Sequence, residues 1–496
     1  MRRHALLYQL DTRLLLRELG GPLGRRADLD DVPDALVDGI AARGFDWAWL
    51  LGVWTTGPVA RAVSRSRPDW REGFLRALPD LAEDDITGSP FAVQSYEVSP
   101  DFGGDAALSR LRERLARRGV KLMLDFVPNH AGLDHPWVTS HPEWLVEGSA
   151  EDLAREPGNF VRLGGRVFAH GRDPYFPGWP DTVQLGWRHP GLRAAMVEEL
   201  RRVAARCDGV RCDMAMLLLP DVFRRTWGDR SLPRDGSAPA DAPFWPGAIE
   251  RVRRERPRFV FLAEAYWGLE EDLQRQGFDF TYDKPLYDRL VAGDGPAVLE
   301  RLAEPPAFQD RSARFLENHD EARAAAAFPP AQHRAAATIA FLVPGLRFFH
   351  EGQLEGRRVQ ISVHLGRRPP EEPDPALRAF YERLLGVLAR RETHDGRFTL
   401  RACRPAWEGN ATCDRFVAMS WEGERRARLL ACVNYGPTRG QAFADAAFPG
   451  LEGRRVVLAD LLGDARYERD GDDLCRRGLY LDLPAWGHHA FEIRES

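Results

Sequence analysis

The sequence predicts an α/β fold: a (β/α)8 TIM barrel with an irregular insertion after strand three and a C-terminal antiparallel β domain. Amphipathic helical segments alternate with short apolar strands, which is typical of parallel β/α units. Eight such units over roughly 390 residues fit one barrel with insertions. Two stretches break the alternation. Residues 131–190 are rich in Pro, Gly, His and Trp, and from residue 396 short alternating strands replace the helices.

The first three strands are predicted from apolar runs next to helical periodicity. The run "HALLYQL" near residue 7 is the first, and the unit "ALVDGIAARGFDWAWLLGVW" ends in the second. In "ALSRLRERLARRGVKLMLDFVPNH", Leu108, Leu111 and Leu115 fall on one helix face, and "VKLMLDF" follows as the third strand.

The same order of elements continues to residue 395. In "LRAAMVEELRRVAARCDGVRCD", Leu192, Met196, Leu200 and Val203 share one helix face before strand four. Strands five to eight are expected in "RFVFLAE", "FDFTY", "ARFLENHD" and "GLRFFHEG", before a last helix in "DPALRAFYERLLGVLARR". A doubly wound open sheet is the competing fold, but no Gly-rich fingerprint follows the first strand.

The pattern divides the chain into three expected domains. The barrel takes residues 1–130 and 191–395, the inserted domain residues 131–190, and a C-terminal β-sandwich residues 396–496. The alternating runs "RFVAMSW", "RLLACVNY" and "RRVVLADLL" predict the strands of the last domain.

Composition excludes several classes of partner. A net charge of −5 does not suggest a nucleic-acid or membrane partner, and no apolar run reaches transmembrane length. The first residues lack the pattern of a secretory signal, and the six Cys are scattered without metal-binding spacing. We therefore expect a cytoplasmic protein without nucleic-acid or membrane partners. The oligomeric state stays open.

Charged and polar residues gather where the barrel strands end. Because side chains at the carboxyl ends of the strands face the active site of such barrels, these residues should meet at one rim. They are Asp125, Asn129 and His130 after strand three, Arg211 and Asp213 after strand four, Glu264 after strand five, and Glu317, Asn318, His319 and Asp320 after strand seven.

Three of these acids suit the cleavage of a glycosidic bond. That reaction needs one carboxyl group to protonate the leaving oxygen and a second to meet the developing oxocarbenium ion. Arg211 should keep Asp213 ionised, whereas the apolar and aromatic surroundings of Glu264 should raise its pKa and retain its proton. Asp320 would bind ring hydroxyls and distort the sugar.

Four stretches resemble, in order, the signature motifs of the α-amylase family of glycoside hydrolases. They are "LDFVPNH", "DGVRCD", "FLAEAYW" and "FLENHD". "GSPFAVQSYEVSPDFGG", "WPDTVQL" and "PGLRFFHEGQ" are similar to further segments of that family. The resemblance covers about residues 5–390, and the tail resembles the family's C-terminal β domain.

The resemblance implies a role for each matching residue. Asp213 would be the nucleophile of a covalent glycosyl-enzyme intermediate, Glu264 the general acid and then base, and Asp320 a stabiliser of the transition state. The substrate-binding residues would be Arg211, which pairs with Asp213, His130 and His319, which bind sugar hydroxyls, Phe91, a stacking ring or a plain packing residue, and Asp125, a structural carboxylate that orders the site.

One departure concerns metal binding. Many members of the family carry His four residues after the nucleophile, with its carbonyl on calcium, whereas this sequence has Leu217. Asn129, the other expected ligand position, is present. We therefore expect no metal and no cofactor, and the calcium site of the family is in doubt.

Further residues could contact a substrate or serve in packing. Aromatic platforms for sugar could come from the inserted domain, at Trp137, Trp144, Phe176, Trp179 and Trp187. Glu321 and Arg323 follow Asp320, and Arg323 is expected at a solvated helix start. His350 and Glu351 after strand eight could contact substrate or pack a loop, and "GHHAF" near residue 489 is expected to pack domains together.

The predicted function is a retaining glycoside hydrolase that acts on α-glucosidic bonds of α-glucans or oligosaccharides. A transglycosylase would use the same residues, because another sugar can intercept the covalent intermediate in place of water. A non-catalytic sugar-binding relative is the remaining alternative, and the presence of all three acids argues against it.

Overall fold

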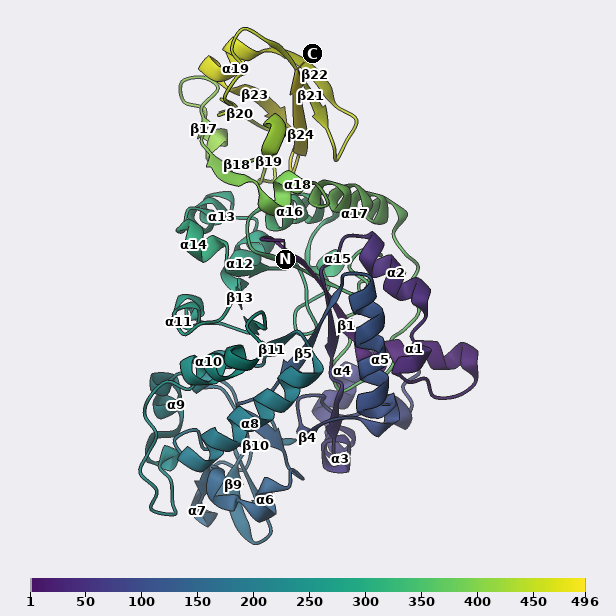
Figure 1. Cartoon of the computed structure of the whole chain (residues 1–496), viewed down its shortest axis with the longest axis vertical. Coiled ribbons are helices and arrows are strands. Elements are labelled where there is room, and N and C mark those ends of the chain that lie inside the picture. Colours follow the sequence, from purple (N-terminus) through teal and green to yellow (C-terminus); the bar gives the residue numbers. More distant parts are fainter. Residues whose placement is uncertain (1, 496) are drawn as a thin grey trace.

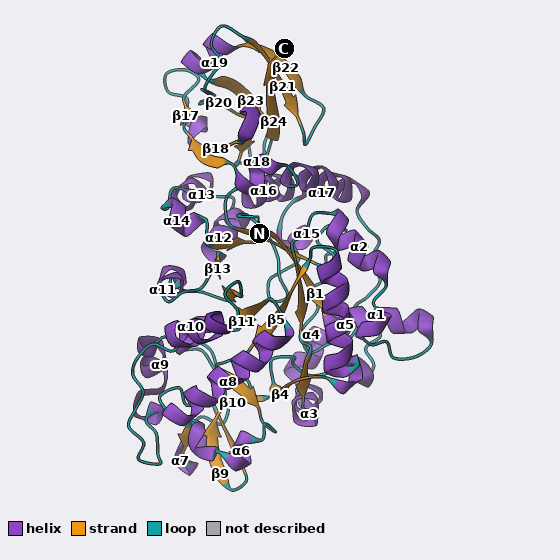
Figure 2. Ribbon diagram, in the orientation of Figure 1, coloured by secondary structure: helices purple, strands orange, loops and turns teal. Residues whose placement is uncertain are grey.

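The computed structural model describes residues 2–495, and its centre is a closed barrel of eight parallel strands (Figures 1 and 2). The strands pair in chain order, and the last one closes on the first. They are β1 (Leu6–Asp11), β2 (Trp47–Leu51), β5 (Lys121–Phe126), β11 (Gly209–Cys212), β12 (Val260–Ala263), β13 (Phe280–Tyr282), β14 (Ser312–Arg314) and β15 (Leu346–His350). The predicted (β/α)8 barrel is confirmed.

Helices surround the barrel and turn their apolar faces toward it. The predicted faces of Leu108, Leu111 and Leu115 in α5 and of Leu192 and Met196 in α8 are buried. The helices that lead from strand to strand are α1 (Thr12–Leu23), α2 (Asp34–Ala42), α5 (Gly104–Arg117), α8 (Pro190–Arg206), α9 (Pro220–Trp227), α10 (Trp245–Glu255), α11 (Glu270–Arg275), α12 (Lys284–Ala292), α13 (Gly295–Leu302), α16 (Pro330–Leu342) and α17 (Pro375–Leu388).

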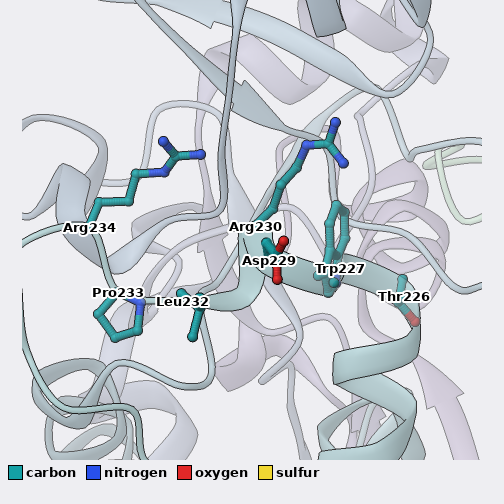
Figure 3. A pocket seen from close by; sticks show the side chains of 8 residues that line it. Thr226, Trp227, Asp229, Arg230, Leu232, Pro233 and Arg234 are labelled. Carbon is teal, nitrogen blue, oxygen red and sulfur yellow. The ribbon is translucent and has the colours of Figure 1, made fainter.

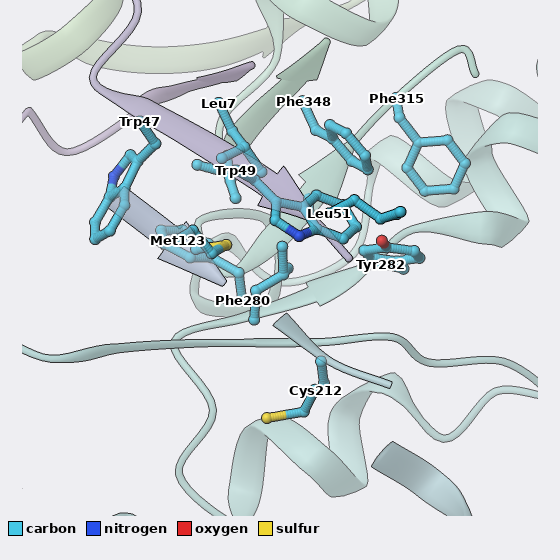
Figure 4. Close-up of a cluster of buried hydrophobic side chains, with 14 of the residues drawn as sticks. Leu7, Trp47, Trp49, Leu51, Met123, Cys212, Phe280, Tyr282, Phe315 and Phe348 are labelled. Atoms are coloured by element: carbon cyan, nitrogen blue, oxygen red, sulfur yellow. The ribbon is translucent and has the colours of Figure 1, made fainter. Parts of the chain in front are cut away.

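The inside of the barrel is filled with side chains. Figure 4 shows Leu7, Trp49, Met123, Phe280 and Phe348 packed against one another, and all five are buried. This packing is typical of the closed interior of such barrels, so any site must lie at a rim.

The chain leaves the barrel twice on the side of the strands' carboxyl ends. After β5, the strands β6 (His130–Gly132) and β10 (Thr182–Gln184) pair, and β7 (Glu147–Gly148), β8 (Phe160–Leu163) and β9 (Arg166–Ala169) form a small sheet. After β2 come β3 (Trp54–Thr56), α3 (Pro58–Ser66), α4 (Pro68–Ala77) and β4 (Val93–Val98). The sequence analysis did not predict α3 and α4.

The C-terminal part is an antiparallel β domain, as predicted. One sheet has the order β16-β18-β19-β24-β21-β22 and the other β17-β20-β23, and residues of both sheets share one apolar core. The strands are β16 (Arg397–Arg401), β17 (Cys403–Arg404), β18 (Phe416–Glu422), β19 (Arg428–Asn434), β20 (Gly440–Ala444), β21 (Arg455–Asp460), β22 (Arg466–Asp470), β23 (Leu479–Leu483) and β24 (His488–Glu495).

This β domain packs on the end of the barrel where the strands begin. The indole of Trp421 donates a hydrogen bond to the carbonyl of Leu342 at 2.7 Å, and its ring centroid lies 5.1 Å from that of His4. Figure 1 shows the domain above α16 and α17, far from the inserted segment. His488 contacts Phe380 of α17, in agreement with the expected packing role of "GHHAF". Within residues 2–495, no helix has the length and apolarity needed to span a membrane.

Candidate active site

Arg211 is the centre of the acidic cluster at the strands' carboxyl ends. It is fully buried in β11, and its guanidinium lies over the rings of Trp49, Phe91 and Tyr282, at 5.4–5.7 Å. Its Nη1 donates to Asp213 Oδ1 at 2.7 Å, and its Nη2 lies 3.0 Å from Glu264 Oε1. One buried cation therefore contacts two carboxylates, where the sequence analysis expected it beside one.

The two oxygens of Asp213 have different surroundings. Oδ1 accepts from Arg211, whereas Oδ2 is buried without a hydrogen-bond partner among the described residues. Burial raises the pKa of Asp213 to about 6, although Arg211 lowers it. The sequence analysis expected Arg211 to keep Asp213 ionised. Desolvation has the larger effect on the pKa of Asp213, so the ionised form is less favoured than expected.

Glu264 is held by two donors. The backbone N–H of Met214 donates to Oε2 at 2.6 Å, and the hydroxyl of Tyr266 donates to Oε1 at 2.9 Å. Met214 adopts a left-handed backbone conformation, with φ of 43°, which is uncommon for a residue other than glycine. Burial raises the pKa of Glu264 to about 7, and the nearby Asp213 and Asp320 act in the same direction.

Asp320 is the exposed member of the three acids. Its side chain is 43 % exposed, and its Oδ2 lies 3.0 Å from His319 Nε2 and 4.0 Å from Arg211 Nη2. Partial desolvation opposes ionisation, but His319 and Arg211 outweigh it and lower the pKa of Asp320. Asp320 thus favours its charged form, whereas Asp213 and Glu264 are shifted toward their protonated forms.

Three of the predicted substrate-binding residues surround the acids. His130 and Phe91 line the same cavity as the three carboxylates. The ring of His319 lies 5.4 Å from Phe91 and 5.6 Å from Trp49, and Gln9 is 2.9 Å from its Nδ1. Burial lowers the pKa of His130 to about 3, so this imidazole is neutral near pH 7.

Asp125 lies behind the cavity instead of facing it. Its two carboxylate oxygens accept from the indole N–H of Trp49, at 3.0 Å, and from the backbone N–H of Gly52, at 2.8 Å. Its backbone carbonyl accepts from Trp54. Both oxygens thus hold groups of the protein itself, which suits a structural carboxylate.

The cavity that these residues line has a volume of about 730 Å³. Of the five candidate aromatics in the inserted segment, Phe176 and Trp179 line it, and the other three do not. Trp187 instead donates to the carbonyl of Pro128, and Trp144 stacks on His141. The sequence analysis missed several lining residues, among them Trp70, Asp173, Asp181, Lys284 and His364.

Residues beyond strands seven and eight have structural partners. Arg323 is buried and lies 2.9 Å from Glu317, so the expected solvated position is wrong. His350 contacts the same Glu317, and Glu351 contacts Arg368. These two pack the loop after β15. Glu321 does line the cavity, where it lies 3.5 Å from Lys284.

The donor set for calcium is incomplete. The amide of Asn129 exchanges hydrogen bonds with Gln184, at 3.3 and 3.1 Å, which occupies the side chain that would bind the ion. Calcium needs six to eight oxygen ligands. Among residues 2–495, no group of three His, Cys, Asp or Glu side chains is arranged to hold a metal. The pairing of Asn129 with Gln184 does not fit an ion bound at the amide oxygen of Asn129.

A second hollow lies at the outer side of the molecule, near the end of α9. Figure 3 shows its lining by Trp227, Arg230, Leu232 and Arg234. It contains none of the three clustered acids, and Arg230 is neutralised by Asp152. The candidate active site is therefore the cavity at the barrel rim.

Comparison with known proteins agrees with this location. Residues 91–277 match the family model of the α-amylase catalytic domain. The α-amylase MalA of Haloarcula japonica is 27 % identical over 280 residues, 53 % of this chain and 36 % of that protein. An α-1,4-glucan:maltose-1-phosphate maltosyltransferase of Cereibacter sphaeroides is 24 % identical over 272 residues, 53 % of this chain and 37 % of that protein. The matched segments thus span little more than a third of the length of these relatives.

The fold comparison extends over the whole chain. The crystal structure of a maltogenic α-amylase from Thermotoga neapolitana superposes with a TM-score of 0.67 and 17 % identity, and the match covers 99 % of this chain and 98 % of the other. The motifs that resemble the family lie together at one end of this barrel, and its catalytic-domain model matches the segment that carries Asp213 and Glu264. The segment of residues 91–277 therefore belongs to the α-amylase catalytic-domain family.

Proposed function

We propose that the protein is a retaining hydrolase of α-glucosidic bonds in α-glucans or oligosaccharides, and that Asp213 is its nucleophile. The observation that carries the proposal is the asymmetry of Asp213. Arg211 holds Oδ1, and the unpartnered Oδ2 remains free to attack an anomeric carbon in the cavity. A covalent glycosyl-enzyme would form there, with inversion at the sugar carbon.

Glu264 has the properties of the second carboxyl group. Its raised pKa retains a proton near neutral pH for the leaving oxygen, and the resulting carboxylate can then activate water. Asp213 and Glu264 contact the two ends of one guanidinium and line the same cavity, which supports the proposal of a retaining pair. The two inversions, at formation and at hydrolysis of the intermediate, give overall retention.

The remaining polar groups would bind the sugar in the cleaved position. Asp320 and His319 supply a charged acceptor and an imidazole, and His130 lines the same cavity as Asp320. Phe91 offers a ring to the apolar face of a pyranose. Hydrogen bonds to ring hydroxyls that strengthen in the transition state would lower the barrier.

Transfer to a second sugar is the other candidate reaction. The aromatic rings of Trp179, Trp267 and Phe176 line the cavity, and Trp267 and Phe176 are exposed, which offers stacking surfaces to an acceptor. One relative is named as a maltosyltransferase that uses maltose 1-phosphate. Water and sugar acceptors would compete for the same covalent intermediate, so hydrolysis and transfer share every step up to its formation.

Product analysis tests the proposal. The protein is incubated with maltooligosaccharides, and the products are followed by proton NMR and chromatography. A hydrolase releases new reducing ends first as the α-anomer, whereas a transferase redistributes chain lengths with no gain in reducing ends. Initial release of the β-anomer would contradict the retaining mechanism, and no turnover of any α-glucan or α-glucoside would contradict the function as a whole.

A further inference from the structure

A third cavity lies between α1 and the segment that follows β2, and it contains none of Asp213, Glu264 and Asp320. Its volume is about 540 Å³, within the range of small-molecule sites. Leu16, Trp54 and Phe102 contribute apolar surface, and Gly20 and Gly24 expose backbone in the last turn of α1 and just after it. A ligand with a carbon skeleton of modest size fits this space.

The charge of the lining is strongly positive. Its lining includes two aspartates, Asp84 and Asp101. It also includes five arginines, which are Arg13, Arg17, Arg25, Arg26 and Arg61. Arg26 contacts Asp101 at 3.1 Å, Arg25 contacts Asp31, and Arg17 lies 4.0 Å from Asp85.

Arg13 and Arg61 differ from these three arginines because neither forms an ion pair with a described residue. In the described part of the chain, neither has a carboxylate oxygen within 4.0 Å.

Arg13 is buried, and among the described residues no carboxylate oxygen forms an ion pair with it. Its exposed fraction is 9 %, and its guanidinium donates only to neutral oxygens: the hydroxyls of Thr56, at 2.9 Å, and Thr87, at 3.3 Å, and the carbonyl of Gly88. Burial lowers the pKa of Arg13 to about 10. The charge of Asp11 opposes this shift, and the neighbouring Arg61 adds to it. A buried cation without an anion is costly, so an anionic group in this cavity would be stabilising.

We propose that this cavity binds a small phosphorylated compound, with its phosphate group between Arg13 and Arg61. A phosphate monoester carries a charge of about −1.5 to −2 near neutral pH, which matches two guanidinium groups, whereas a carboxylate supplies only one charge. Guanidinium groups also bind phosphate oxygens in a bidentate manner. The apolar surface at Leu16 and Trp54 would contact the carbon skeleton of the ligand.

The cavity shares a chain segment with the catalytic pocket. Thr87 lines this cavity and Gly88 accepts from Arg13, while Ser89 and Phe91 line the pocket with the three acids. A phosphate that binds Arg13 competes with Thr87 and Gly88 for the same Nη1. The site is thus one short loop away from the ring proposed to stack on the sugar.

Titration calorimetry on the whole chain tests the site, with inorganic phosphate and glucose 6-phosphate as probes. Excess maltose is present throughout to occupy the catalytic pocket. Arg61→Gln is the informative variant because Arg61 is exposed and forms no ion pair with another described residue. Arg117→Gln is the matched control, since Arg117 is an exposed arginine on α5 outside the cavity. Glucose and gluconate serve as neutral and carboxylate probes.

We expect saturable binding of at least one phosphate probe, weakened roughly tenfold or more in Arg61→Gln, as for the loss of a charge-assisted hydrogen bond, and unchanged in Arg117→Gln. Glucose should not bind under these conditions. The proposal is overturned if neither phosphate probe binds, if gluconate binds as tightly as glucose 6-phosphate, or if Arg61→Gln binds as the unmodified protein does. None of these results depends on catalytic turnover.

Discussion

The hydroxyl of Tyr266 donates a hydrogen bond of 2.9 Å to Oε1 of Glu264, the same oxygen that lies 3.0 Å from Nη2 of Arg211. The backbone N–H of Met214 occupies the other oxygen. The proposed general acid is therefore fixed at both oxygens by groups from its own loop and from the loop after β11. Such fixed donors set both the direction of the carboxyl group and the ease with which it loses its proton.

Tyr266→Phe should change the pH profile more than the fold. The lost donor favours the ionised carboxylate, so its removal raises the pKa of Glu264 by about 0.5 to 1 unit, as for a hydrogen bond of about 1 kcal/mol. The alkaline limb of kcat/KM should move to higher pH by that amount. A lower kcat with an unmoved alkaline limb would show that Tyr266 acts by packing alone.

The pH dependence of activity should be a narrow bell. The proposed mechanism needs Asp213 ionised and Glu264 protonated, and the pKa values of these groups are raised to about 6 and about 7. Activity therefore rises as Asp213 loses its proton near pH 6 and falls as Glu264 loses its proton near pH 7. The pKa of Asp320 is lowered, so this acid stays ionised throughout. Initial rates between pH 4 and pH 9 measure both limbs, and a maximum above pH 8 would contradict the roles.

Asp213→Asn and Glu264→Gln should each lower kcat by roughly three orders of magnitude or more, because each removes a group that acts on the reacting atoms. Both substitutions keep the volume of the side chain, and Arg211 retains another carboxylate in each variant. Circular dichroism should show an unchanged fold. Asp221→Asn, on an exposed acid of α9, is the control and should keep full activity. Ordinary turnover in either catalytic variant would overturn the assignment.

Removal of calcium should have no effect. Gln184 holds the amide of Asn129, and an ion at this place would have to break that pair. Treatment with EDTA, followed by activity and thermal unfolding measurements with and without added calcium, checks the expectation. A rise of the melting temperature on addition of calcium, reversed by the chelator, would show that a metal site exists here.

Trp421→Ala should destabilise the junction between the β domain and the barrel. The buried indole leaves a cavity and an unpaired carbonyl at Leu342, which costs about 3–5 kcal/mol. Chemical denaturation followed by fluorescence measures the loss. Trp407→Ala, at a tryptophan that is 54 % exposed, is the matched control and should change stability by less than about 0.5 kcal/mol. Equal effects of the two substitutions would contradict the importance of this contact.

Local patterns in the sequence were enough for the barrel and for the acids. Leu108, Leu111 and Leu115 predicted their helix because periodicity is a local property. Asp213 and Glu264 could be placed together because the carboxyl ends of parallel strands meet at one rim. The expected pairing of Arg211 with Asp213 was right in geometry, yet the effect of burial on the pKa of Asp213 needed the surrounding atoms.

Contacts between distant loops could not be predicted in the same way. Trp70 lies on α4, and no local signal places that helix beside Asp320. Arg323 looks solvent-exposed in a polar stretch, but Glu317 and the loop after β15 enclose it. In both cases the deciding partner is remote in sequence, so only the folded chain brings it near. The cavity proposed to bind phosphate could not be predicted for the same reason, since Arg13 and Arg61 follow different strands and only the folded chain brings them together.

The β domain attaches through Trp421 at the opposite end of the barrel from the candidate active site, and its last strand, β24, starts beside α17 and runs toward the outer tip of that domain (Figure 1). Immobilisation of the enzyme on a bead or electrode through this tip would therefore point the pocket mouth away from the support. A polymeric glucan of the proposed kind could then reach the pocket without obstruction by the support, so this tip is the suitable attachment point for a reusable catalyst.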